Sequence, residues 1–221
     1  MIIRIGDLLT EKGKNKMTIH ENKRKLRITF NAPATLVFVG ICLLAQGISA
    51  LTGGAANRAV FSVYRSSLLD PLTYVRCVCH VFGHADWSHL MGNMMYILIL
   101  GPMIEEKYGT SGMVFVMAAT AVVTGIVNMV FFPDTMLLGA SGVVFALILM
   151  ASITASDDRT IPVTFILVAL LYIGQQVYEG VFVRDNVSQI THIAGGAVGS
   201  LCGFAMNRKK GEHFFRSGKR K

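Results

Sequence analysis

Four polar residues with the side chains of acyl-transfer chemistry lie in segments that are otherwise largely apolar. They are Ser141, His192, His89 and Asn93. A serine hydroxyl attacks a carbonyl only when a base takes its proton, and an imidazole can be that base. Donor groups aimed at the developing oxyanion then lower the barrier. These residue types indicate hydrolysis by an activated serine, provided that the fold brings them together.

Ser141 lies in the sequence Gly139-Ala140-Ser141-Gly142, directly after a loop over residues 133–138. This position places its hydroxyl near a helix N-terminus, where unpaired N–H groups and the helix dipole favour an oxyanion. Glycine also lets a substrate backbone approach closely, so Gly139 is a candidate substrate-binding residue. The alternative is a packing patch, because small residues are common where membrane helices meet.

His192 is followed by Gly195 and Gly199, and this spacing puts all three on one face of a helix. Such a face brings another helix close, and if that helix carries Ser141, the imidazole can reach the hydroxyl. His89 and Asn93 are four residues apart and share a face, so both can aim donors at one point, as an oxyanion hole requires. Structural hydrogen bonds are the alternative role for each of these residues.

The composition indicates that lipid surrounds these segments. The chain has 221 residues, of which 52% are hydrophobic and 15% are charged, and its mean hydropathy is +0.53. The formal net charge of +8 comes mainly from the two ends, which argues against a nucleic-acid-binding surface. By the positive-inside rule we expect both termini in the cytoplasm and therefore an even number of spans. Residues 1–9 lack the features of a cleaved signal peptide, so we expect the first apolar segment to remain as an anchor.

Segments of about 20 apolar residues, the length that crosses a bilayer, divide the chain. We expect six membrane helices, at about residues 33–51, 88–104, 113–132, 139–155, 161–178 and 187–206. They form one domain, 33–207, between a basic N-terminal segment, 1–32, and a basic tail, 208–221. An amphipathic outer loop with short helices is expected over residues 52–87.

The expected topology places the candidate residues in one layer. The second, fourth and sixth helices all run inward from the outer side, and His89, Ser141 and His192 lie near their starts. Ionisable residues within a membrane are costly and rarely face lipid, so histidines at matching depth indicate a functional site. The sequence has no acid in this layer that could orient His192, which favours a serine–histidine dyad over a triad.

Three stretches resemble the signature sequences of the rhomboid family, in the family's order: Trp87-Ser88-His89-Leu90-Met91-Gly92-Asn93, Gly139-Ala140-Ser141-Gly142 and His192-Ile193-Ala194-Gly195-Gly196. The resemblance covers about residues 34–207 and includes Glu105 near Tyr108-Gly109. It implies an all-α membrane protein whose six-helix bundle encloses a water-accessible cavity. It also implies a serine protease that cuts single-span or other transmembrane proteins near the outer face, with no metal or other cofactor.

The resemblance assigns roles to the candidate residues. Ser141 corresponds to the nucleophile and His192 to the general base, while His89, Asn93 and the Ser141 N–H correspond to the oxyanion donors. Two positions depart from the family's pattern. Phe145 stands where many members have a tyrosine stacked on the catalytic histidine, and Val75-Arg76 preserves only half of a Trp-Arg pair in the outer loop.

Two other functions remain open at this point. Cys77, Cys79, His80 and His84 are metal-binding residue types in one loop, although zinc ligands usually have wider and more regular spacings. A rhomboid-like pseudoprotease or a six-helix transporter would bind membrane proteins or solutes without cleaving them. Pseudoproteases typically lack the serine or the histidine, and a transporter would be expected to show internal repeats.

Overall fold

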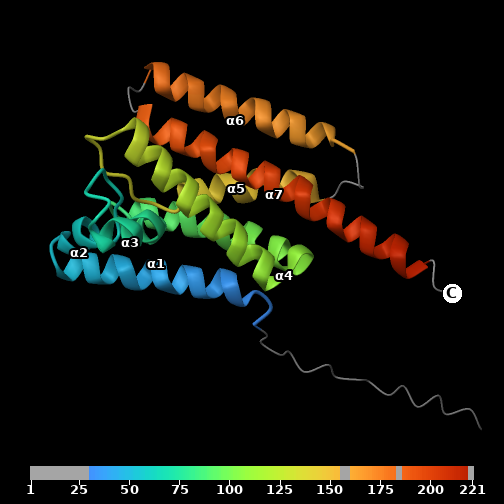
Figure 1. Ribbon diagram of the computed structural model, residues 1–221, viewed down its shortest axis with the longest axis horizontal. Coiled ribbons are helices and arrows are strands. Elements are labelled where there is room, and N and C mark those ends of the chain that lie inside the picture. The colour runs from blue at the N-terminus through green and yellow to red at the C-terminus, as the bar shows by residue number, and fades with distance from the viewer. Residues whose placement is uncertain (1–29, 155–159, 183–185, 219–221) are drawn as a thin grey trace, which may run out of the picture. The chain divides into compact units, whose positions relative to one another are not determined.

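The computed structural model describes residues 30–154, 160–182 and 186–218, and these residues form helices and no strand. The elements in chain order are α1 (Pro33–Leu51), α2 (Ala55–Ala59), α3 (Pro71–Cys79), the 3-10 helix η2 (His80–Phe82), α4 (Trp87–Phe131), α5 (Ser141–Thr154), α6 (Val163–Phe182) and α7 (Asn186–Gly218), as Figure 1 shows. The all-α prediction is confirmed for this part of the chain. The expected basic segment 1–32, apart from residues 30–32, and the side chains of the tail 208–221 lie outside it.

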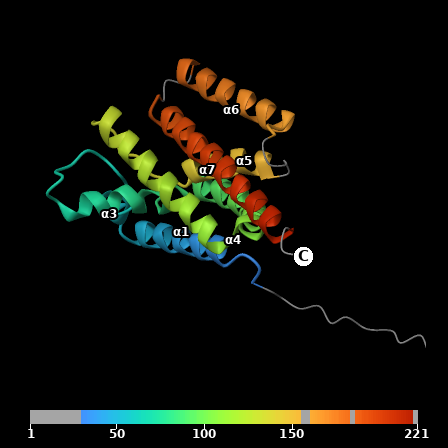
Figure 2. The ribbon, with the colours of Figure 1, turned by 45° about the vertical axis from the view of Figure 1, so that its right-hand side comes forward.

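Helix α4 contains two of the six expected helices. Gly109, within its 45 residues, has φ 81° and ψ 162°, which is not helical. The chain reverses direction there, so that α4 consists of two arms, residues 87–108 and 110–131 (Figures 1 and 2). We expected the first of these helices to end near Ile104, whereas it continues to Tyr108. A positive φ favours glycine, which explains why the reversal occurs at this residue.

Two helices of the described residues, α1 and α4, are long and apolar enough to cross a membrane by length and composition. Helix α5 and the first part of α6, Val163–Gln175, are apolar but shorter. Helix α7 continues past the end of the expected sixth segment at residue 206 and reaches Gly218.

The closest helix contact joins α5 to α7. A Cβ atom on Gly195 would overlap the Gly142 carbonyl, and one on Gly199 would overlap the backbone of Ala146. These two glycines are one turn apart on α7, and they allow its backbone to lie against that of α5. Helix α6 packs beside α7 and α5 at the edge of the bundle (Figures 1 and 2).

The loop between α1 and α4 contains the expected short helices, and Arg76 braces it. The Asp70 side chain caps α3 by accepting from Leu72 N at 3.0 Å. Arg76 Nε donates to the Ala59 carbonyl at 2.9 Å, and its Nη1 lies 3.4 Å from the Asp70 carboxylate. The Arg76 guanidinium also lies 4.8 Å from the centre of the Tyr64 ring. The arginine of the incomplete Trp-Arg pair therefore holds the loop through backbone, carboxylate and aromatic contacts.

A buried carboxylate attaches α1 to the reversal in α4. Glu105 accepts from Ala34 N at 2.9 Å, from Thr35 N at 3.0 Å and from Thr35 Oγ1 at 2.9 Å. It also accepts from Thr110 Oγ1 at 2.9 Å, across the turn at Gly109. The first N–H groups of a helix have no intrahelical acceptor, and a negative charge there also complements the helix dipole. Glu105 thus serves as the cap that the N-terminus of α1 otherwise lacks.

Replacing Glu105 by alanine should strongly destabilise the fold. The change leaves buried N–H donors without an acceptor, and each such group costs about 1–3 kcal/mol. We expect a loss of about 3 kcal/mol or more in the free energy of unfolding, measured by denaturant titration in mild detergent, and a smaller loss for Glu105→Gln. Glu106→Ala is the matched control because Glu106 is exposed. Equal losses at the two positions would contradict the capping role.

Candidate active site

The hydroxyl of Ser141 and the imidazole of His192 form a direct hydrogen bond. Ser141 is the first residue of α5, and His192 lies in the second turn of α7. The distance from His192 Nε2 to Ser141 Oγ is 2.8 Å. The contact follows from the close packing of α5 on α7 at Gly195 and Gly199, because those glycines lie on the same face of α7 as His192. The geometry is the one that a base needs in order to take a proton from a serine.

Aromatic rings pack against this pair. The Phe145 ring centre lies 4.5 Å from that of His192 and 4.4 Å from that of Tyr172, with interplanar angles of 49° and 39°. Phe145 is one turn after Ser141, so the ring expected at this position does contact the histidine. Tyr172 comes from α6, and its buried hydroxyl has no hydrogen-bond partner in the described part of the chain. The stack therefore links α6, α5 and the imidazole.

His89 and Gly139 meet beside the serine. Asp86 caps α4 by accepting from His89 N at 2.8 Å, which fixes the first turn of that helix. A Cβ atom built on Gly139 would lie 3.1 Å from His89 Nε2 and 3.8 Å from Ser141 Oγ. Gly139 also has φ +133°, a conformation that side chains disfavour. Any larger residue at 139 would displace the imidazole of His89 from its place near the serine.

Asn93 contributes a buried donor to the same place. Its side chain is 7% exposed, and Nδ2 has no hydrogen-bond partner among the residues that the structure describes. A buried donor without an acceptor is unfavourable and calls for a specific explanation. Asn93, His89, Ser141 and His192 all line one cavity of about 500 Å³. The structure thus brings together in one cavity the four residues singled out from the sequence.

Comparison with known proteins identifies the family of the chain. The family model described as "Rhomboid domain" matches residues 71–209, more than half of the chain. The chain belongs to the rhomboid family. It is 25% identical over 179 residues to "Rhomboid protease GlpG" of Yersinia pestis (strain Pestoides F), covering 78% of this chain and 62% of that protein.

Two further relatives come from other lineages. "Rhomboid protease GluP" of Bacillus subtilis (strain 168) is 24% identical over 175 residues, which are 76% of this chain and 33% of that protein. "Rhomboid-like protein 11, chloroplastic" of Arabidopsis thaliana is 26% identical over 136 residues, which are 55% and 49%. The chain spans about half or less of the length of these two relatives. Rhomboid family members are membrane proteins.

His84, which the sequence suggested only as a possible metal ligand, contacts the residues around Ser141. Its Nδ1 lies 3.2 Å from the Phe82 carbonyl, and its Nε2 lies 3.5 Å from the backbone nitrogen of Ala140. A carbonyl only accepts and a backbone N–H only donates, so Nδ1 carries the proton and Nε2 is the acceptor. The ring also packs edge-on against His89 at 5.1 Å. His84 therefore holds the segment before Ser141 and supports His89 at the same time.

The four loop residues considered as metal ligands do not converge on one point. Three of them, Cys77, His80 and His84, contact different backbone groups. Cys77 Sγ is 3.8 Å from the Val122 carbonyl, and His80 Nε2 is 3.1 Å from the Ala121 carbonyl. His84 is engaged as described, and Cys79 is half-buried on α3. Within residues 30–154, 160–182 and 186–218, no group of three or more His, Cys, Asp or Glu side chains could hold a metal ion.

Burial keeps the two loop histidines neutral. It lowers the pKa of His80 to about 4, against the hydrogen bond to the Ala121 carbonyl. Burial, with the positive charge of His89 as a second cause, lowers the pKa of His84 to about 4. Because a histidine in the unfolded chain has a pKa of about 6.5, the unfolded state takes up protons first as the pH falls. Stability from these groups is therefore present above about pH 6.5 and is lost as the pH falls toward 4.

His84→Gln should reduce this pH dependence without removing the hydrogen bonds. Glutamine can donate to the Phe82 carbonyl and accept from Ala140 N, but it does not titrate. Between pH 7.5 and 5.0 we expect the wild type to lose about 2–4 kcal/mol of unfolding free energy, and His84→Gln roughly half as much because His80 remains. The comparison is made by denaturant titration at each pH. His84→Leu, which makes neither bond, should be less stable at both values. A wild-type pH profile in His84→Gln would exclude the neutral histidine as a source.

Proposed function

We propose that the chain is an intramembrane serine endopeptidase in which Ser141 is the nucleophile and His192 is the general base. The observation that carries the proposal is the 2.8 Å contact between His192 Nε2 and Ser141 Oγ at the wall of a cavity of about 500 Å³. In the reaction the imidazole takes the hydroxyl proton as Oγ attacks the peptide carbonyl. The same imidazole then gives the proton to the leaving amine, and water hydrolyses the acyl-enzyme by the same steps.

Three donors are proposed for the oxyanion. Asn93 Nδ2 is buried and has no partner among the residues that the structure describes. His89 lies beside Gly139, and the Ser141 N–H is in the first turn of α5, where no intrahelical acceptor exists. An acceptor that arrives only with the substrate explains why a costly unpaired donor is kept at Asn93. Such donors stabilise charge that develops in the transition state, and each is typically worth about 10²–10³ in rate.

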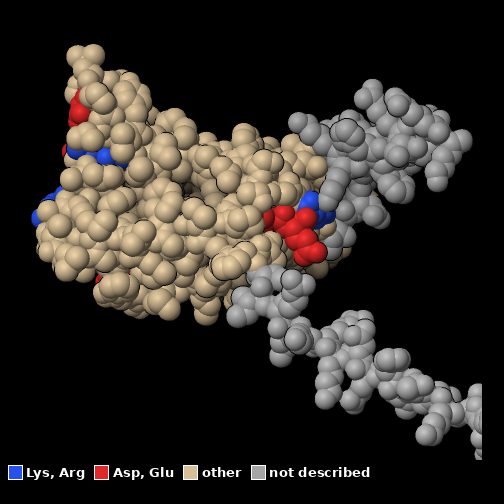
Figure 3. Space-filling model, turned by 90° about the horizontal axis from the view of Figure 1, so that it is seen from below, with Lys and Arg blue, Asp and Glu red and all other residues tan. Residues whose placement is uncertain are grey.

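The proposed topology has six membrane crossings: α1, the two arms of α4, and α5, α6 and α7. The charged side chains described in the structure support it, since they form two groups, Arg58, Arg65, Asp70, Arg76, Asp86 and Asp134 in the loops, and Glu105, Glu106 and Lys107 at the reversal. In Figure 3 the charges on the visible face gather at opposite ends, with an uncharged band between them. Both termini are placed on the cytoplasmic side.

The length of α5 supports a catalytic serine below the membrane surface. Its 14 residues span about 21 Å, compared with about 30 Å for the hydrocarbon core. If the end of α5 lies near the cytoplasmic boundary, Ser141 lies roughly 9 Å below the outer one. Water reaches it through the cavity. The proposed substrates are therefore single-span or other transmembrane proteins, cut in an extended segment near the outer end of the helix, because a helix keeps its carbonyls hydrogen-bonded.

Cleavage by wild-type protein and variants tests the proposal. Ser141→Ala and His192→Ala should each abolish cleavage of a reconstituted single-span protein whose outer helix end contains glycine or proline. The double variant should be no worse than either, since the pair acts as a unit. Ser152→Ala is the matched control, because Ser152 is also on α5 but bonds the Leu149 carbonyl. A fluorophosphonate probe should label the wild type and not Ser141→Ala.

Two results would overturn the assignment. Cleavage by Ser141→Ala near the wild-type rate would exclude this serine as nucleophile. Folded wild-type protein that neither cleaves nor reacts with the probe would instead favour a rhomboid-like protein that binds without cutting.

Reporter fusions test the topology. A fusion at Lys221 should report a cytoplasmic C-terminus, and an insertion in the loop over residues 52–87 should report the opposite side. An outer C-terminus would give an odd number of crossings, and it would remove the shared depth proposed for Ser141 and the two histidines.

A further inference from the structure

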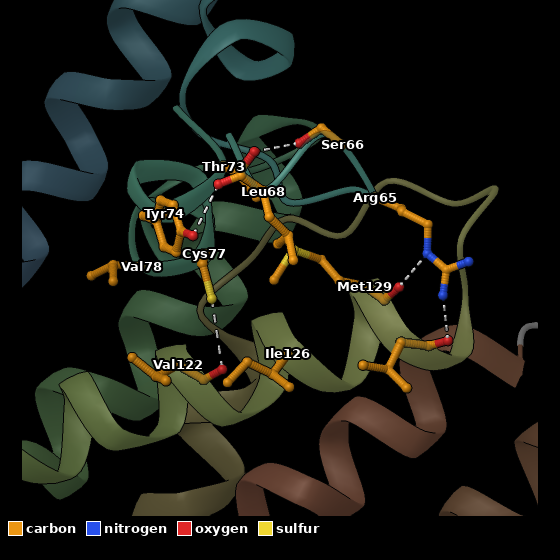
Figure 4. A pocket seen from close by; sticks show the side chains of 11 residues that line it. Arg65, Ser66, Leu68, Thr73, Tyr74, Cys77, Val78, Val122, Ile126 and Met129 are labelled. Atoms are coloured by element: carbon orange, nitrogen blue, oxygen red, sulfur yellow. Dashed lines mark hydrogen bonds between the residues drawn. The ribbon is translucent and has the colours of Figure 1, made fainter. Parts of the chain in front are cut away.

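A second cavity, of about 650 Å³, lies between the outer loop with α3 and the second arm of α4. Figure 4 shows the side chains around it: Leu68, Tyr74 and Val78 come from the loop and α3, and Val122 and Ile126 come from α4. None of its lining residues lines the cavity at Ser141. Its volume is in the range of small-molecule sites, about 300–1,000 Å³.

One end of this cavity carries a fixed positive charge. Arg65 Nε donates to the Met129 carbonyl at 2.9 Å, and Nη2 donates to the Val130 carbonyl at 3.0 Å. These carbonyls belong to the last turn of α4, where carbonyl groups lack intrahelical partners and the dipole favours a cation. A guanidinium has five N–H groups, so about three remain to bind a ligand. Arg65 is exposed, and Figure 4 shows it at one side of the side chains that line the cavity.

The rest of the lining is apolar or already paired. The hydroxyls of Ser66 and Thr73 bond to each other at 2.7 Å, and Thr73 Oγ1 also donates to the Ser67 carbonyl. Val122 is eight residues before Val130, which corresponds to about 12 Å along the helix. The cavity thus combines an anion-binding group at one end with an apolar wall that extends about two turns away from it.

We propose that this cavity binds one phospholipid, with the phosphate on Arg65 and an acyl chain against Val122 and Ile126. The proposal rests on the membrane placement proposed above, in which the end of α4 near Arg65 is at the outer boundary. An amphiphile with one negative group and one chain matches a site with one cation and an apolar wall. The lipid would fill the space between α3 and α4. This cavity is separate from the one that the proposed catalytic residues line.

Native mass spectrometry of the full-length protein in mild detergent tests the site. Phosphatidylglycerol, phosphatidylcholine and inorganic phosphate are each titrated against the wild type and three variants. Arg65→Gln removes the charge, and Ile126→Trp fills the apolar part while leaving Arg65 in place. Arg58→Gln is the matched control, since Arg58 is an exposed arginine of α2 that does not line the cavity.

The wild type and Arg58→Gln should bind one molecule of either lipid, with the anionic one preferred. Arg65→Gln should weaken phosphatidylglycerol binding by about fivefold, the scale of one exposed charge pair. Ile126→Trp should weaken both lipids by a larger factor, about tenfold or more, because it blocks the chain. Inorganic phosphate alone should not compete at matched concentration, because it lacks the apolar part.

Wild-type lipid binding in both Arg65→Gln and Ile126→Trp would overturn the proposal, and so would competition by phosphate alone. Each preparation is also assayed for Ser141-dependent cleavage, which separates this proposal from the proposed protease activity. If the protein cleaves but its lipid binding does not depend on the cavity residues, only the lipid proposal is refuted. If lipid binding depends on the cavity residues but the protein does not cleave, only the protease proposal is refuted.

Discussion

The close approach of α7 to α5 is the constraint on which the site depends. Gly195 and Gly199 lie against the backbone of Gly142 and Ala146 with no room for a side chain. Only at this separation does an imidazole on α7 reach a hydroxyl at the start of α5. In the proposed membrane placement no hydrophobic effect drives these helices together, so packing of small residues and interhelical hydrogen bonds must hold the contact. The glycines therefore contribute both to helix association and to the geometry of the serine and histidine.

Elsewhere in the bundle, side chains pair with the backbone groups that helix ends leave without intrahelical partners. Glu105 satisfies the first N–H groups of α1, and Arg65 satisfies the last carbonyls of an arm of α4. His84 satisfies Ala140 and is itself satisfied by Phe82. Each of these contacts lies at a helix end, which is where the backbone has unpaired groups. Charged and imidazole side chains therefore bind the ends of these helices, whereas small residues pack along the length of α5 and α7.

Much of the fold follows from the sequence because apolar length and helix ends are local properties. The bounds of α1 coincide with the first expected segment, and the short helices of the outer loop were expected between residues 52 and 87. The sequence also predicted Ser141 and His192 near helix starts. The spacing of Gly195 and Gly199 indicated the face on which α7 packs. The contacts of Glu105, His84 and Arg65 could not be predicted from the sequence, because their partners are backbone groups up to 71 residues away. A carbonyl or N–H has no sequence signature, so only the fold identifies such partners.

Asn93 shows how a departure from full hydrogen bonding points to function. Among the described residues, the hydroxyls of Thr120 and Tyr172 are also buried without a partner, but they do not line the cavity at Ser141, whereas Asn93 does. Leaving a buried amide unpaired costs about 1–3 kcal/mol, so a fold selected for stability alone would favour an apolar residue there. An acceptor that enters the cavity would offset this cost, and in the proposed reaction the oxyanion next to Ser141 is that acceptor. In the proposed reaction, a donor that pairs only with the oxyanion stabilises the transition state more than the bound substrate, which is the condition for catalysis.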